Sequence, residues 1–164
     1  MELLVAVTII SALVSLAFPA YVNIMQRSRA ADCMGHLRGI GAALQLYLAD
    51  NNNNMPTLMM ARESTSDNVP VMDNTLSQYT DSPDAFHCPA DTAQLFQTTG
   101  SSYIWNNLIN GQNTANLDFM GIANQGSHIP IASDKQSFHT YGGVQVNILY
   151  VDGHAAKEIQ FKTN

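Results

Sequence analysis

Four residues near the C-terminus form a group of side chains that could bind a metal ion. They are Asp134, His139, Asp152 and His154. A β-hairpin could bring them together, and imidazole and carboxylate ligands suit zinc, other transition metals or calcium. The interpretation we favour is structural: Asp152 and Gly153 form a turn, and the histidines hydrogen-bond to the backbone or stack on Tyr141 and Tyr150. We therefore expect no cofactor, with a divalent cation at these four residues as the alternative.

The two cysteines, Cys33 and Cys88, are predicted to form a disulfide, because an even count behind an export-type N-terminus favours pairing. Closing the loop between them would contribute roughly 4 kcal/mol in the chain-entropy model. The alternative is a pair of buried free thiols in a cytosolic protein. The sequence has no Cys-x-x-Cys motif and no paired Cys/His ligand spacing, so a structural zinc site is not expected.

Catalytic motifs are absent from the sequence. It contains no Gly-x-Ser-x-Gly, no phosphate-binding glycine loop and no His-Glu-x-x-His. His87 precedes Cys88 and could suggest a Cys/His nucleophile, but adjacent residues tend to point in different directions, and a cysteine held in a disulfide cannot attack. The sequence therefore predicts a protein that is not an enzyme.

The charge balance excludes a nucleic-acid partner. The chain carries 7 Lys and Arg against 13 Asp and Glu, for a net charge of −6. Binding to a phosphate backbone requires clustered basic side chains, and here they are scattered. Only 12% of the residues are charged and 46% are hydrophobic, and many of the apolar residues lie before position 30.

These side chains must be positioned by a long N-terminal helix and a small domain. From Leu3 to Phe18 the sequence is uncharged, and three hydroxyl residues are its only polar interruptions. If the helix continues past Pro19, where we expect a kink, the uncharged stretch reaches Met25. It is then about 35 Å long, enough to cross a hydrocarbon core of roughly 30 Å. Residues 1–25 are thus predicted to be a transmembrane or filament-core half of the helix.

Residues 26–50 are predicted to continue the helix as an amphipathic half. Leu37, Ile40, Leu44 and Tyr47 share one face, which we expect to pack on the folded domain. Gly39 and Gly41 would allow close packing or a bend. The polar run from Asp50 to Asn54 ends the helix, and Pro56 prevents its return. The whole helix would have about 48 residues and a length of roughly 70 Å.

Residues 51–164 are predicted to form a loop-rich head with short elements, because turn-forming residues recur every few positions. Tyr103–Trp105 is a candidate for a short strand or a packed aromatic cluster. Residues 144–151 are a strong strand candidate, Asp152-Gly153 a tight turn, and residues 154–161 the return strand. The predicted fold class is α+β: a long N-terminal helix packed on a small domain with a C-terminal antiparallel β-hairpin or sheet.

Three interpretations of the apolar segment compete. A secretory signal peptide cut before Phe18 would release a soluble binding domain, but the residues before the apolar run are Met-Glu rather than basic. An ordinary membrane anchor conflicts with the disulfide, because Arg27 and Arg29 would hold the C-terminal side in the cytoplasm. The third interpretation is a pilin-type helix whose basic leader is missing from this sequence.

The third interpretation rests on a resemblance. Glu2-Leu3-Leu4-Val5, the apolar run and Pro19-Ala20-Tyr21 resemble the N-terminal methylation segment of type IV pilins and type II secretion pseudopilins. In that family a prepilin peptidase removes a basic leader and the new N-terminal amine is methylated. The resemblance implies that Glu2 pairs with the N-terminal amine of a neighbouring subunit during assembly. Family members carry a cleavage glycine and further residues before this glutamate, so we expect that Met1 is an internal methionine taken as the start, or that the sequence is trimmed.

The resemblance extends to the C-terminal region of one pseudopilin-like group, which is abundant in bacteria with many such genes. The spacing between His139 and Asp152 is longer here than in the usual signature, which predicts a longer turn. The matching positions, in order, are Cys33, Cys88-Pro89-Ala90-Asp91, His139, Gly142-Gly143, Asn147 and Asp152-Gly153-His154.

The resemblance implies a structural subunit of a type IV pilus or a type II secretion-like filament. Its partners would be other pilin-like subunits, the inner membrane and, for the precursor, the prepilin peptidase. Before assembly the helix would lie in the bacterial inner membrane with the head in the periplasm. After assembly the subunit would belong to a periplasmic or extracellular filament. The alternatives are the secreted binding domain released near Phe18 and a metal-binding domain built on the His/Asp group.

Overall fold

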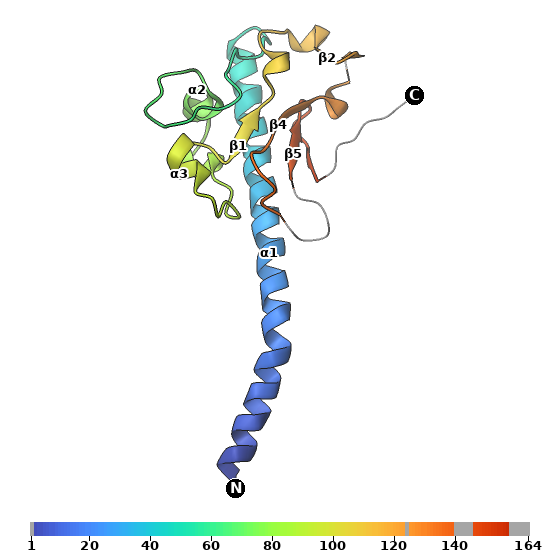
Figure 1. Ribbon diagram of the computed structural model, residues 1–164. Helices are drawn as coiled ribbons and strands as arrows, with labels where there is room; N and C mark the ends of the chain where they lie inside the picture. Colours follow the sequence, from blue (N-terminus) through green and yellow to red (C-terminus); the bar gives the residue numbers. More distant parts are fainter. Residues whose placement is uncertain (1, 124, 140–145, 158–164) are drawn as a thin grey trace.

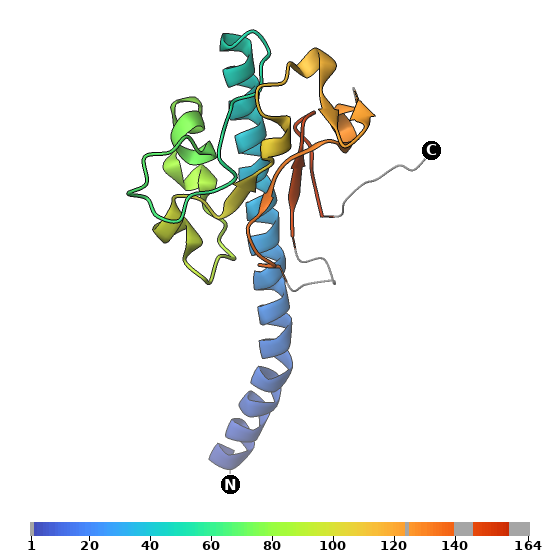
Figure 2. The same cartoon turned by 45° about the horizontal axis from the view of Figure 1, so that its top comes forward.

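The computed structural model describes residues 2–123, 125–139 and 146–157 of the chain, with the backbone alone at Glu2 (Figure 1). Its dominant element is helix α1, Glu2–Asp50, with 49 residues. The helix runs through Pro19 without interruption, and below the head its N-terminal half curves gently (Figures 1 and 2). Proline lacks the amide hydrogen that would bond one turn back, which favours a bend, and the kink at Pro19 stays a prediction. The predicted long helix is confirmed.

Helix α1 ends where the sequence predicts. The amide of Asn53 donates to the carbonyl of Leu48 at 2.8 Å, which satisfies one of the last free carbonyls of the helix. Asn52 and Asn53 have φ values of 55° and 59°. Asparagine tolerates this left-handed conformation better than most residues, so the asparagine run serves as the helix stop.

The second half of α1 supplies one wall of the hydrophobic core. Leu37, Ile40 and Leu44 are completely buried, as their shared face predicts. Tyr47 is half-buried and packs edge-on against Tyr79, with ring centroids 5.9 Å apart. Each fully buried leucine or isoleucine contributes roughly 2 kcal/mol of transfer free energy, so this stripe fixes the head on the helix. The other buried α1 residues are Ala30, Cys33, Gly41, Ala43 and Leu48.

A four-stranded antiparallel sheet packs against this half of α1. Its strands are β1 (Tyr103–Trp105), β4 (Pro130–Asp134), β5 (Ile148–Tyr150) and β6 (Ala155–Ala156), in the order β1-β4-β5-β6. Strands β5 and β6 contact α1 directly, and Gly41 of the helix accommodates them. A Cβ atom at Gly41 would lie 3.1 Å from Leu149 and 3.4 Å from Gly153, so this glycine provides close packing.

The predicted C-terminal hairpin is present but shorter than expected. The strand predicted for 144–151 covers Ile148–Tyr150, and the return strand covers Ala155–Ala156; residues 144–145 and 158–161 lie outside the described part of the chain. The turn between them contains Gly153 with φ of 86°, a value that favours glycine. Tyr103–Trp105 is a strand, one of the two alternatives considered. Strand β4, which lies in the middle of the sheet, was not predicted.

The rest of the head consists of short elements. Helices α2 (Met72–Leu76) and α3 (Leu95–Thr99) lie on the opposite side of α1 from β5 (Figures 1 and 2). A two-stranded hairpin joins β2 (Asp118–Phe119) to β3 (Ile122–Ala123). The described 3-10 turns are Ser77–Tyr79, Pro83–Phe86, Asn107–Ile109, Thr114–Asn116 and Gly126–His128.

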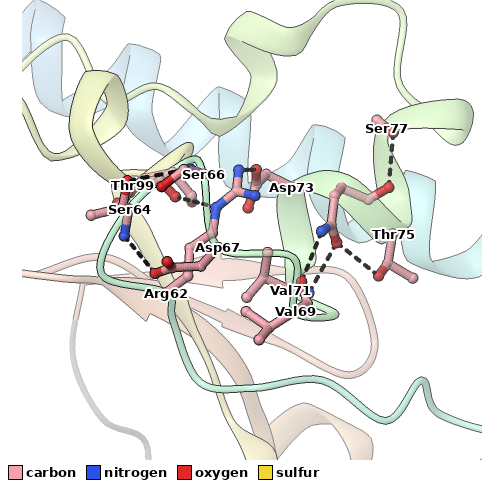
Figure 3. A network of polar contacts seen from close by, with 12 residues as sticks. Arg62, Ser64, Ser66, Asp67, Val69, Val71, Asp73, Thr75, Ser77 and Thr99 are labelled. Atoms are coloured by element: carbon pink, nitrogen blue, oxygen red, sulfur yellow. Dashed lines mark hydrogen bonds and ion pairs between the residues drawn. The ribbon is translucent and has the colours of Figure 1, made fainter.

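A partly buried ion pair holds the first long loop of the head to α2 and α3 (Figure 3). Arg62 pairs with Asp73 of α2, and its Nε donates to the carbonyl of Thr99 in α3 at 2.9 Å. Burial raises the pKa of the Asp73 carboxyl, while the Arg62 guanidinium acts in the opposite direction. Gly100 follows α3 with φ of 84°, and a Cβ atom there would collide with both charged groups.

Candidate functional site

The N-terminal half of α1 is the largest unusual feature of the molecule. Its most apolar 18-residue window has a mean hydropathy of 2.4, and none of that window is buried within the described structure. The exposed fraction is 78% at Leu3, 60% at Ile10 and 63% at Ile24. Apolar side chains therefore face outward around the whole helix. A monomer in water would leave this surface exposed, at a free-energy cost of roughly 25 cal/mol per Å² of apolar area.

The three hydroxyl side chains between Leu3 and Phe18 donate their hydrogen bonds within the helix. The hydroxyl of Thr8 donates to the carbonyl of Val5 at 2.8 Å, and Ser11 donates to Thr8 at 2.9 Å. Ser15 donates to the carbonyl of Ala12 at 2.8 Å. Because these three hydroxyls do not depend on water, this part of the helix can be placed in lipid or against other apolar helices without leaving these donors unpaired.

The length of the segment matches a membrane. From Leu3 to Met25 the helix rises about 35 Å, compared with a hydrocarbon core of roughly 30 Å. Tyr21 near its end is 61% exposed, and aromatic side chains of this kind favour the membrane interface. Arg27 and Arg29 follow within one turn. The helix is long and apolar enough to cross a membrane, and an N-terminal segment of this type is equally compatible with an export signal or an anchor.

Glu2 is the first residue of α1, so its backbone lies at the helix N-terminus. The amide dipoles sum there to a partial positive charge that favours a nearby carboxylate. The helix therefore places the predicted assembly residue at the tip of the apolar segment, at the end away from the head (Figure 1). The role of Glu2 in assembly stays a prediction.

The predicted disulfide between Cys33 and Cys88 is confirmed. Both cysteines are completely buried, and the bond joins α1 to the segment that leads from Pro83–Phe86 into α3. It excludes a nucleophilic role for Cys88. The neighbouring His87 stacks on Phe96 instead, with ring centroids 4.8 Å apart.

Asp91, the last residue of the Cys-Pro-x-Asp segment, has a structural role. Its carboxylate accepts hydrogen bonds from the amides of Leu95 (3.1 Å) and Phe96 (2.9 Å) at the start of α3. It also accepts from the hydroxyl of Ser102 at 2.8 Å, and the Ser102 hydroxyl accepts from the amide of Cys88 at 3.1 Å. Asp91 therefore ties α3, the approach to β1 and the disulfide segment into one unit.

Asp134 and His139, two of the four predicted metal ligands, meet beside the disulfide. His139 Nε2 lies 3.2 Å from Asp134 Oδ2, 2.8 Å from the side-chain nitrogen Nδ2 of Asn147 and 3.7 Å from Cys88 Sγ. Asp134 Oδ2 also accepts from the backbone amide of Asn147 at 2.6 Å. Asp134 Oδ1 is buried and has no hydrogen-bond partner among the described residues. A protonated Nε2 would donate to the carboxylate, and an unprotonated one would accept from the Asn147 side chain.

Asp152 and His154 form a second, exposed pair. The carboxylate of Asp152 lies 2.5 Å from Nδ1 of His154, whose ring stacks on Tyr150 at a centroid distance of 4.5 Å. Gly153 lies against Gly41 of α1, eight residues and about 12 Å along the helix from Cys33. The two pairs are therefore separated, and the predicted four-residue metal site is not assembled. The stacking on Tyr150 agrees with the structural interpretation; Tyr141 lies outside the described residues.

Among the described residues, one group of three potential metal ligands has its ligand atoms within 4.8 Å of one another, namely Cys33, Cys88 and His139. The two sulfur atoms are bonded to each other, so they do not offer thiolates to a metal. Asp134 and His139 are better described as part of a buried polar cluster that packs on this disulfide.

Tyr103 is a member of this cluster that sequence reasoning did not identify. It is 1% exposed, and its hydroxyl donates to the carbonyl of Cys33 at 3.3 Å. Burial and the nearby carboxylates of Asp134 and Asp91 raise the pKa of Tyr103 far above its ordinary value. The tyrosine therefore acts as a permanent donor that links β1 to α1. Its position in a three-residue strand carried no sequence signal for this contact.

Comparisons of this chain with protein-family models, with curated proteins and with solved structures gave no match.

Proposed function

We propose that this protein is a structural subunit of a pilin-like filament, a pilin or pseudopilin, that assembles through the apolar half of α1. The observation that supports the proposal is the continuity of α1. The same 49-residue helix projects an apolar surface at one end and carries the buried stripe of a disulfide-linked head at the other. In a single subunit the apolar half has no cover within the described chain, so it requires lipid or other apolar helices.

Two environments in succession would satisfy this helix. Before assembly it resides in the inner membrane, where its length matches the hydrocarbon core. In the filament the apolar halves of many subunits pack together, and the heads form the outer surface. The internal hydrogen bonds of Thr8, Ser11 and Ser15 suit both states, because neither state supplies water to these hydroxyls.

Glu2 sets the register in this proposal. A carboxylate at the end of an apolar helix is costly within a membrane unless it is near the interface or paired with a positive charge. Pairing with the N-terminal amine of a neighbouring subunit would supply that charge in the filament. Assembly would then combine non-directional apolar contacts with one charge pair that fixes the relative height of adjacent subunits.

Substitution of Glu2 tests the assembly role. Glu2→Ala should leave membrane insertion unchanged, because the apolar segment is intact, and should abolish incorporation into filaments sheared from cells. Glu63→Ala is a matched control, because Glu63 is exposed on the head and lies outside the apolar helix. Normal incorporation of Glu2→Ala would contradict the charge-pairing role. Failure of both variants to reach the membrane would indicate a folding or export defect instead.

The rival function is a soluble secreted binding domain, with the apolar segment removed before Phe18. In the structure Phe18 lies within α1, and its side chain is 66% exposed. Cleavage there would leave the core-forming half of the helix attached to the head. The two functions differ in one property of the mature protein, which is whether the first 17 residues remain.

A further inference from the structure

A cavity of about 290 Å³ lies between α1 and the head, just above the apolar half of the helix. Gln26 and Arg29 line it from α1, while Ala90 and Thr92 line it from the segment after the disulfide. The remaining lining residues are Gln136, Ser137, Phe138 and His139, which follow strand β4. Three parts of the chain that are distant in sequence thus meet around one space. Its volume is close to the lower end of small-molecule pockets, roughly 300 Å³, so it suits a headgroup rather than a whole lipid.

The level at which this cavity would lie in a membrane follows from the length of the apolar segment. With Leu3–Met25 filling the hydrocarbon core, Gln26 to Arg29 would lie in the polar layer of the leaflet next to the head. Phospholipid phosphates lie in that layer. The cavity would therefore open where phosphate groups are most concentrated, and a soluble ligand would have to compete with them.

The chemistry of the lining suits an anion. Arg29 supplies a positive charge and a planar set of N–H donors that match phosphate oxygens. Gln26, Thr92 and Ser137 supply neutral donors. The nearest exposed acid along α1, Asp32, does not line the cavity.

We propose that this cavity binds the phosphate-bearing headgroup of an anionic phospholipid in the leaflet next to the head. The inference rests on the proposed function in one respect, since it requires the apolar half of α1 to reside in a membrane before assembly. Binding would hold the subunit at a fixed height and orientation in the bilayer, with the head resting on the membrane surface.

A shallow open groove along α1 adjoins this cavity and provides a path for the remainder of the lipid. Tyr21, Val22 and Met25 line it, together with the same Gln26 and Arg29 that line the first cavity. It therefore continues from the headgroup site toward the apolar half of the helix. A lipid with its phosphate at Arg29 would place its glycerol and the start of its acyl chains along these apolar side chains.

Native mass spectrometry of the full chain in detergent tests the proposal. Phosphatidylglycerol and phosphatidylcholine with the same acyl chains are added in equal amounts, and the two lipid-bound forms are compared. One arginine near an anionic surface is worth about 1 kcal/mol, so the expected preference for phosphatidylglycerol is about five-fold. Arg29→Gln should abolish the preference, whereas Arg38→Gln, an exposed arginine farther along the same helix, should retain it.

A second variant separates a shaped site from general attraction to charge. Thr92→Phe fills the cavity and keeps every charge, so it should also lose the preference. If Thr92→Phe retains the full preference, or if Arg29→Gln does, the cavity is not the binding site and the proposal is wrong. Millimolar inorganic phosphate should not displace the lipid; displacement would identify a soluble anion as the ligand and overturn the proposal.

Flotation with vesicles distinguishes this inference from the proposed function. The full chain should float with phosphatidylcholine vesicles alone, because the apolar helix suffices for residence in the membrane. Flotation without a preference for phosphatidylglycerol would overturn only the headgroup site. Failure to float with either lipid would contradict the membrane-resident state on which both proposals depend.

Discussion

Removing the Cys33–Cys88 disulfide should destabilise the head strongly. The bond connects residues separated by 55 positions, and it joins α1 to the segment that leads into α3. Both cysteines are completely buried in the core, next to His139. Without the bond, Cys33 and Cys88 can move apart in the unfolded chain, so the unfolded state gains conformational entropy. The packing of the folded head stays the same.

The size of the effect follows from the loop length. For a loop of this size the chain-entropy model gives about 4 kcal/mol at room temperature. Typical domains have a free energy of unfolding of roughly 5–15 kcal/mol, so the loss is a large share of the total. With a urea dependence of about 2 kcal/mol per molar, the unfolding midpoint should fall by about 2 M.

Trp105 makes the measurement direct. It is the only tryptophan of the chain, and in β1 it is 1% exposed. Its fluorescence therefore reports unfolding of the head during a urea titration of the full chain in detergent. The variant is Cys33→Ala/Cys88→Ala, and the control is the wild-type chain after reduction in urea and refolding with reductant. Both should show the same lowered midpoint, because both lack the cross-link.

Two results would contradict this reasoning. A midpoint shift below about 0.5 M, or about 1 kcal/mol, would mean that the unfolded chain is not restricted by the bond. A large shift in the double variant with none in the reduced wild type would assign the loss to the missing sulfur atoms in the core rather than to the cross-link.

Two further substitutions test the packing of the head on α1 and the role of the Cys-Pro-x-Asp segment, with thermal unfolding as the measurement in both cases. Gly41→Val should cost about 1–3 kcal/mol, because Leu149 and Gly153 lie against this glycine, whereas Gly39→Val should be neutral or slightly stabilising, since nothing lies within 4 Å of a Cβ there. Equal effects of the two would contradict close packing at Gly41. Asp91→Ala should cost about 1–2 kcal/mol through the lost cap of α3, and the exposed Asp81→Ala should cost almost nothing.

The parts of the fold that could be predicted are those with a local signal. The apolar run and the spacing of Leu37, Ile40 and Leu44 determine α1 and its buried face, and both are confirmed. The asparagine run predicted the end of the helix. The disulfide followed from an even cysteine count, which requires no knowledge of geometry.

The missed parts depend on tertiary contacts. Strand β4 contains proline, serine and aspartate and shows no alternation, and its strand conformation comes from pairing with β1 on one side and β5 on the other. Local propensity cannot reveal such a strand.

The candidate site divides in the same way. The sequence grouped Asp134, His139, Asp152 and His154 by proximity along the chain. In the structure Asp134 and His139 lie beside the disulfide, and Asp152 and His154 lie in an exposed turn. Tyr103 lies beside Cys33 through a contact between segments 70 residues apart, which its residue type alone did not indicate. Asp91 is close to Cys88 in the sequence, but the contacts of its carboxylate with Leu95, Phe96 and Ser102 were not predicted.

In the proposed function, the apolar half of α1 remains on the mature protein and serves in a filament. N-terminal sequencing with intact mass, on protein recovered from its native host, tests it most directly. We predict a methylated N-terminus ahead of Glu2, with the whole apolar segment retained. An N-terminus at or near Phe18 would contradict it, because the segment would then be an export signal and the head a soluble domain.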